Sequence, residues 1–188
     1  SVRRGLGLSG LLSLILVLTI LTVGLRSFRM VVAVLLTLCM GLVWTAGFAL
    51  AACGALNIIS VSFAVLFVGL GVDFGIHFCL RFREAALSGL TNKEALVEAV
   101  AGTGPALLLC ALTGVLAFYS FLPTDYVALA QLGFIAGTGL LIGLFANLTV
   151  LPALLSDSLH PSIIAFVVVY GLDWVATVPP TAALCRDP

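Results

Sequence analysis

The sequence predicts an all-α fold, a polytopic transmembrane helix bundle of five to six spans with one short cytoplasmic amphipathic helix. Composition is the first observation behind this prediction: 62% of the 188 residues are hydrophobic, 9% are charged, and the mean hydropathy is +1.30. A soluble domain has roughly 25% charged residues. The second observation is the length of the apolar runs, because a helix needs ~20 apolar residues to cross ~30 Å of hydrocarbon.

Five apolar runs of this length are separated by short polar segments. They extend over about residues 8–25, 30–50, 58–80, 105–122 and 127–151. A sixth run, at 163–184, is weaker, because it contains Asp173 and the pair Pro179-Pro180, and proline interrupts the hydrogen bonds of a helix.

Basic residues fall in two of the predicted loops. Arg26 and Arg29 separate the first two runs, and Arg81, Arg83 and Lys93 follow the third. An even number of crossings lies between these loops, so both belong on one side of the membrane. Because an excess of arginine and lysine is typical of cytoplasmic loops, we expect both to be cytoplasmic.

The most polar stretch of the chain, residues 81–102, lies between the third and fourth runs. Thr91 followed by Glu94 is the T-x-x-E pattern of a capping box, which predicts that a helix begins here. Apolar residues then recur on one side of this helix, and they are Ala95, Leu96, Ala99 and Val100. The pattern predicts a short amphipathic helix along the cytoplasmic face; a solvated loop is the alternative.

Several classes of function have no support in the sequence. Eight basic and eight acidic side chains cancel, so no basic patch indicates nucleic acid. The five cysteines form no C-x-x-C pattern, and no metal-ligand cluster, nucleophile elbow or phosphate-binding loop is present. We therefore expect neither an enzyme nor a bound cofactor or metal.

One acidic residue, Asp73, stands inside the third apolar run. Apart from His77, every other residue of 56–80 is uncharged at neutral pH. A carboxylate at the centre of a transmembrane helix costs roughly 2.5–3.5 kcal/mol on insertion scales. Such residues usually face a bundle interior or a water-filled cavity, and they mark ion or proton pathways.

Residues four apart share a helix face, so Gly69, Asp73 and His77 form one stripe. Gly69 leaves room beside the carboxylate, and His77, whose charge changes near neutral pH, is a candidate to relay a proton. A purely structural hydrogen bond of Asp73 is one alternative. The other is a His77 that only extends toward the membrane surface.

The string GLGVDFGIHF, followed by arginines and a capped helix, resembles the fourth transmembrane helix of resistance-nodulation-division transporters. The similar branch is the mycobacterial-membrane-protein-large type, which includes hopanoid and other lipid exporters. In that family a Gly-x-x-x-Asp-Tyr/Phe motif carries the proton-relay aspartate. Here the motif falls on Gly69, Asp73 and Phe74.

The resemblance covers about residues 7–155. On the next helix Thr113 occupies the family's hydroxyl position, whereas the common second threonine is Gly114 here, which argues against a paired hydroxyl relay. The Leu-Pro-Ala-Leu sequence at 151–154 is similar to the end of the family's sixth helix.

The resemblance implies a transporter in the bacterial inner (plasma) membrane that is driven by proton motive force and exports hydrophobic or lipid molecules. Asp73, His77 and Thr113 would form its proton relay, with Gly69 and Phe74 as helix packing around it. Transporters of this superfamily have two six-helix halves, and residues 1–155 match helices two to six of one half. We therefore expect a fragment that needs the missing second half or a homo-oligomer partner.

Residues 156–188 change in character. The stretch YGLDWVATVPPTAALC, within 161–188, resembles a helix of a major facilitator carrier, which belongs to a different superfamily. We expect this tail to be an additional apolar helix of foreign origin.

An alternative to transport is a membrane scaffold module, because sterol-sensing domains resemble the same five-helix block. The carboxylate of Asp73 distinguishes the two functions, since a passive sensor needs no ionisable residue in its membrane core.

Overall fold

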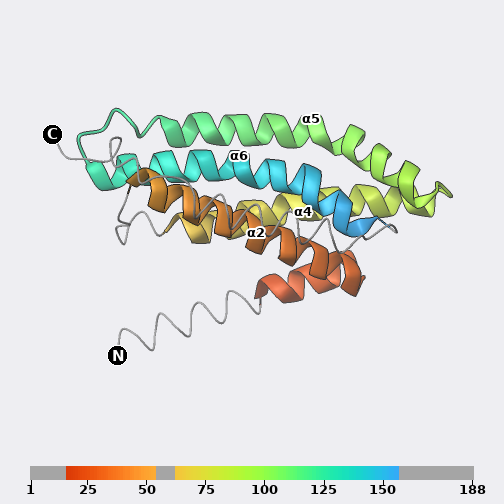
Figure 1. Ribbon diagram of the computed structural model, residues 1–188. Helices are drawn as coiled ribbons and strands as arrows, with labels where there is room; N and C mark the ends of the chain where they lie inside the picture. The colour runs from red at the N-terminus through yellow and green to blue at the C-terminus, as the bar shows by residue number, and fades with distance from the viewer. Residues whose placement is uncertain (1–15, 54–61, 157–188) are drawn as a thin grey trace, which may run out of the picture.

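The computed structural model describes residues 16–53 and 62–156, and the regular structure in these residues is helical (Figure 1). Four helices are each long and apolar enough to cross a membrane. They are α2 (Phe28–Cys53), α4 (Phe63–Leu87), α5 (Asn92–Tyr119) and α6 (Val127–Leu155). A shorter apolar helix, Leu16–Leu25, precedes them. The predicted all-α membrane bundle is therefore confirmed.

Three of the observed helices, α2, α4 and α6, end beyond the predicted runs. The clearest case is α4, which does not end near Leu80 but continues through Arg81, Arg83 and Glu84 to Leu87. Arginine and glutamate are good helix formers, so the change from apolar to charged residues marks a change of environment and not the end of the helix. Of the first predicted run the described part is the helix Leu16–Leu25, and the sixth run and the tail after Ser156 lie outside the described residues.

The helix α6 is at the centre of the bundle. It packs against α2, α4 and α5, whereas α2 and α5 make no contact with each other. In Figure 1, α6 accordingly lies between α5 and α2. Its small residues explain this position, because glycine lets neighbouring helix backbones approach closely.

The ring of Phe67 on α4 packs directly against glycines of two neighbouring helices. A Cβ atom added to Gly41 of α2 would lie 2.7 Å from the ring, and one added to Gly143 of α6 would lie 3.1 Å from it. On another side of α6, a Cβ at Gly133 would overlap the carbonyl oxygen of Phe118 on α5. The close contacts of α6 with its neighbours therefore depend on glycine.

The predicted amphipathic helix is not a separate element. It is the first part of α5, which runs from Asn92 through Pro105 to Tyr119, so the helix that contains the fourth predicted run begins at Asn92 and not near Pro105. Proline is tolerated inside transmembrane helices, because neighbouring groups satisfy the backbone that it leaves free. Figure 1 shows that α5 bends along its course, as expected of a helix that contains proline.

The start of α5 is the capping box that the sequence predicts. The Thr91 hydroxyl accepts a hydrogen bond of 3.4 Å from the Glu94 amide, and the Glu94 carboxylate accepts one of 3.0 Å from the Thr91 amide. Of the predicted apolar stripe, Ala95 and Ala99 are fully buried, whereas Val100 is 37% exposed. This segment therefore packs by its alanines onto the bundle.

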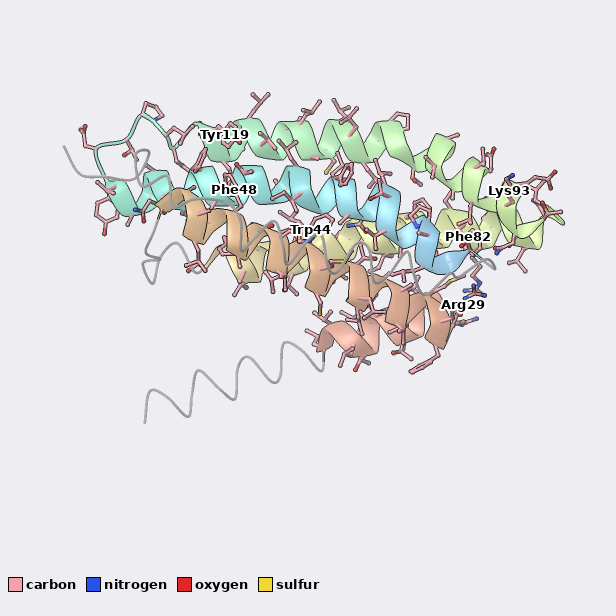
Figure 2. All side chains as sticks on the ribbon, in the orientation of Figure 1. Arg29, Trp44, Phe48, Phe82, Lys93 and Tyr119 are labelled. Atoms are coloured by element: carbon pink, nitrogen blue, oxygen red, sulfur yellow. The ribbon has the colours of Figure 1, made fainter. Side chains whose placement is uncertain are left out.

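Charged side chains gather at one end of the bundle, which we call the arginine end and define by Arg29, Arg81, Arg83 and Lys93. Figure 2 shows Arg29 and Lys93 at this end. Arg81 of α4 forms ion pairs of 2.8 Å with Glu84 and 2.9 Å with Glu98, the second of which joins α4 to α5. Arg83 donates a hydrogen bond of 3.5 Å to the carbonyl oxygen of Leu25.

Candidate functional site

Gly69, Asp73 and His77 lie on one stripe of α4, as the spacing predicts, and all three are exposed. The expectation that Asp73 faces the bundle interior is wrong for the described helices. The reason is that α4 packs by its other faces. A Cβ added to Gly71 would lie 2.8 Å from Leu38 of α2, and one added to Gly75 would lie 2.8 Å from Val34.

Within the described residues, Asp73 and His77 have no hydrogen bond or ion pair with another side chain. Both groups can take up and release protons, and they stand one helical turn apart on an otherwise apolar helix. A charged side chain that faces lipid is costly. The stripe is therefore suited to contact with a further helix or a water-filled space, and not to contact with lipid chains.

The two residues expected to pack around Asp73 behave differently. Phe74 is 3% exposed and belongs to a small core with residues of α5 and α6, which are Leu107, Ala111, Val115, Leu140 and Leu144. Gly69 has open space instead, because no atom lies within 4 Å of a Cβ added there. Phe74 thus anchors α4 to α5 and α6 immediately beside the outward carboxylate.

Thr113 lies on the exposed side of α5 and bonds to its own helix. Its hydroxyl donates to the carbonyl oxygens of Leu109 and Cys110 at 3.1 and 2.9 Å, and no hydrogen bond joins it to Asp73. Gly114 faces α6, since a Cβ there would lie 2.7 Å from Leu140. The position of the family's second threonine is therefore part of the α5–α6 contact in this chain.

Asn147, a buried polar residue of α6, is not among the residues predicted from the sequence. Asn147 is 3% exposed, its amide nitrogen donates to the carbonyl oxygen of Gly143 at 2.9 Å, and its Oδ1 has no partner among the described residues. The signal was present, because Asn147 is the one carboxamide in the second half of a long apolar run. In the part of the chain that the structure describes, no group of histidine, cysteine, aspartate or glutamate side chains is arranged to hold a metal ion.

The fold and the stripe together define a multi-pass membrane protein that carries an ionisable group on a transmembrane helix, which is a feature of transporters. Comparison with known proteins agrees. Residues 1–158 match the model of the MMPL family, and the chain belongs to this family. Its relatives include transporters, and the expectation that the chain is not an enzyme agrees with this membership.

Two relatives are named as the hopanoid transporter HpnN. The protein of Burkholderia multivorans is 46% identical over 155 residues, and that of Rhodopseudomonas palustris is 42% identical over 155 residues. Each match covers 82% of this chain and 18% of the relative. A putative membrane protein of Methanocaldococcus jannaschii is 31% identical over 146 residues, which cover 76% of this chain and 37% of that protein. The chain therefore spans about a fifth of the length of the two hopanoid transporters.

Proposed function

We propose that this chain is part of a proton-driven transporter that exports hydrophobic or lipid molecules. In this proposal Asp73 takes up and releases the coupled proton, and His77 and Thr113 relay it. The observation that carries the proposal is the position of Asp73 on an exposed stripe of a long apolar helix. An ionisable residue at such a position marks a proton or ion pathway by default.

The outward direction of the stripe supports a further part of the proposal, which is that a second membrane unit completes the site. This unit is either the remainder of a longer transporter or a second copy of the chain. The matched relatives are much longer than this chain. A partner helix that covers Gly69, Asp73 and His77 would remove the cost of exposing the carboxylate to lipid.

The names of two relatives, both hopanoid transporters, support a substrate class for the proposal. We propose a hopanoid-like lipid as substrate, the bacterial inner membrane as location, and residues 1–155 as a partial transporter domain. We place the arginine end on the cytoplasmic side, because arginine and lysine favour that side.

A chimera tests the role of Asp73. Residues 1–158 replace the matching segment of the Burkholderia multivorans relative, and hopanoid transport is measured with and without an uncoupler in cells that lack the native protein. We expect uncoupler-sensitive transport that is abolished by Asp73→Asn and retained by the control Asp125→Asn, whose carboxylate lies outside the stripe. Equal amounts of each chimera in the membrane must be verified by immunoblotting. Transport that persists in Asp73→Asn would rule out this residue as the proton carrier.

A further inference from the structure

Two arginines near the arginine end, Arg26 and Arg83, carry charges that no acidic side chain balances within the described residues. Arg81, two positions before Arg83 on α4, is paired with both Glu84 and Glu98. In the part of the chain that the structure describes, Arg26 and Arg83 form no ion pair. This part of the surface therefore has uncompensated positive charge.

A hydrogen bond places the two arginines beside each other. Arg83 donates at 3.5 Å to the carbonyl oxygen of Leu25, and this oxygen belongs to the peptide group that joins Leu25 to Arg26. The guanidinium group of Arg83 is therefore next to the backbone of Arg26. Arg83 makes no other hydrogen bond among the described residues, so most of its five N–H donors remain unused.

The backbone of Arg26 has a left-handed conformation, with φ of 49°. Its amide donates to the carbonyl oxygen of Thr22 at 3.0 Å, which is the bond that ends a helix at a left-handed residue. Glycine is usual at such a position, because a Cβ atom is disfavoured there. The turn itself therefore gives no reason for an arginine, and the exposed side chain needs a different explanation.

Large apolar side chains near these arginines are exposed. Phe28 follows Arg26 by two residues and is 85% exposed, and Leu87 follows Arg83 by one helical turn and is 77% exposed. Figure 1 shows the connection before α2 at the same end of the bundle as the turn between α4 and α5. Basic residues combined with exposed phenylalanine and leucine are typical of a surface at the level of the lipid headgroups.

We propose that Arg26 and Arg83 bind the phosphate group of an anionic phospholipid, with Phe28 and Leu87 against its acyl chains. Guanidinium groups match phosphate oxygens in bidentate geometry. Basic pockets between transmembrane helices on the cytoplasmic side, where we place the arginine end, bind anionic headgroups. A zwitterionic lipid fits less well, because its headgroup cation faces the same arginines. The site goes beyond the proposed transport function, and lipid binding is measured without transport.

Binding of a fluorescent phosphatidylglycerol to the full 188-residue chain in neutral detergent micelles tests the site. Unlabelled phosphatidylglycerol should displace the probe several-fold better than unlabelled phosphatidylcholine. Inorganic phosphate should not displace it, because it has no acyl chains to contact Phe28 and Leu87. Displacement by phosphatidylcholine that equals displacement by phosphatidylglycerol would overturn the proposal. Displacement by inorganic phosphate alone would overturn it as well, because it would indicate a site for the free ion.

Substitutions locate the site on the chain. Arg26→Gly removes one guanidinium group and keeps the turn, because glycine adopts a positive φ freely. We expect it to weaken phosphatidylglycerol binding about five-fold, the contribution of one arginine near an anionic surface. Arg83→Gln should weaken it to a similar extent, and Arg26→Lys should retain most of the affinity.

The matched control is Lys93→Gln, which removes one positive charge from α5 at the same end of the bundle (Figure 2). It should leave the affinity nearly unchanged, and circular dichroism verifies that each variant is folded. Equal weakening by Lys93→Gln and Arg26→Gly would overturn the proposal, because it would show a general attraction to this end and not a site. Unchanged affinity in a folded Arg26→Gly variant would overturn it too.

Discussion

Arg29 of α2 and Leu155 of α6 are joined by a hydrogen bond of 3.1 Å, in which the guanidinium group donates to the backbone carbonyl oxygen. Arg29 also donates to the carbonyl oxygen of Ser156 at 2.9 Å, and Asn92 donates to that of Leu155 at 3.3 Å. The last carbonyls of a helix have no partner within the helix. Side chains of α2 and α5 supply these partners, so the end of α6 is held at the arginine end of the bundle.

The first prediction concerns this attachment. Arg29→Leu removes two charge-assisted hydrogen bonds and leaves the α6 carbonyls less satisfied, so we expect the free energy of unfolding to fall by about 1–2 kcal/mol. Chemical unfolding in mixed micelles measures the change. Arg26→Leu is the matched control, because Arg26 lies in the same loop and is not part of this attachment. Equal losses in the two variants would show that the loop charge matters and the attachment does not.

The second prediction concerns the contact between α5 and α6. Gly133→Ala places a Cβ against the backbone carbonyl oxygen of Phe118, which cannot rotate away, so we expect a loss of roughly 1–3 kcal/mol in the free energy of unfolding. Gly69→Ala is the control, because no atom lies within 4 Å of its added Cβ. There alanine should stabilise α4 by about 0.5–1 kcal/mol. A tolerated Gly133→Ala would contradict the described helix contact.

The third prediction compares two adjacent residues of α4. Phe74→Ala should leave a cavity between α4, α5 and α6 and lower the free energy of unfolding by about 3 kcal/mol. Asp73→Asn, one position earlier on the exposed stripe, should change it by less than about 0.5 kcal/mol. Thermal unfolding in bicelles, followed by circular dichroism, measures both. A large loss in Asp73→Asn would show that the carboxylate is buried by this chain itself.

The class of fold was predictable because it depends on composition and on run length, which a membrane constrains strongly. The ends of the helices were less predictable. Hydropathy locates the part of α4 inside hydrocarbon, but the helix continues to Leu87 because its charged residues still favour a helix. Likewise Pro105 suggested a boundary, while the packing of Ala95 and Ala99 keeps the capped segment continuous with α5.

The residues of the candidate stripe were predictable from the sequence. Whether the stripe faces the bundle interior or the outside was not. Spacing alone puts Gly69, Asp73 and His77 on one stripe. Which side of α4 faces its neighbours depends on contacts made elsewhere, such as Gly71 with Leu38. Those contacts join segments far apart in the chain, and a single sequence contains no direct record of them.

The fourth prediction concerns topology. The arginine end should be cytoplasmic, and the segment before α4 should lie on the other side. On a background without the native cysteines, Asn92→Cys should react with a membrane-impermeant reagent only from the cytoplasmic side. Asn57→Cys should react only from the opposite side. Labelling of both positions from the same side would exclude a membrane crossing by α4.

The fifth prediction is that the 188-residue chain alone does not catalyse proton-linked transport. In the proposed function a second unit covers the exposed stripe of α4, because an ionised Asp73 that faces lipid is costly. Liposomes that contain the purified chain are loaded with a lipophilic dye and given a pH gradient. Dye release should equal that of empty liposomes and should not change in Asp73→Asn. The chimera with the Burkholderia multivorans relative is the positive control for the assay, because it supplies the remaining helices. Release by the chain alone that an uncoupler abolishes would show that the described bundle, or an assembly of its copies, already contains a complete pathway.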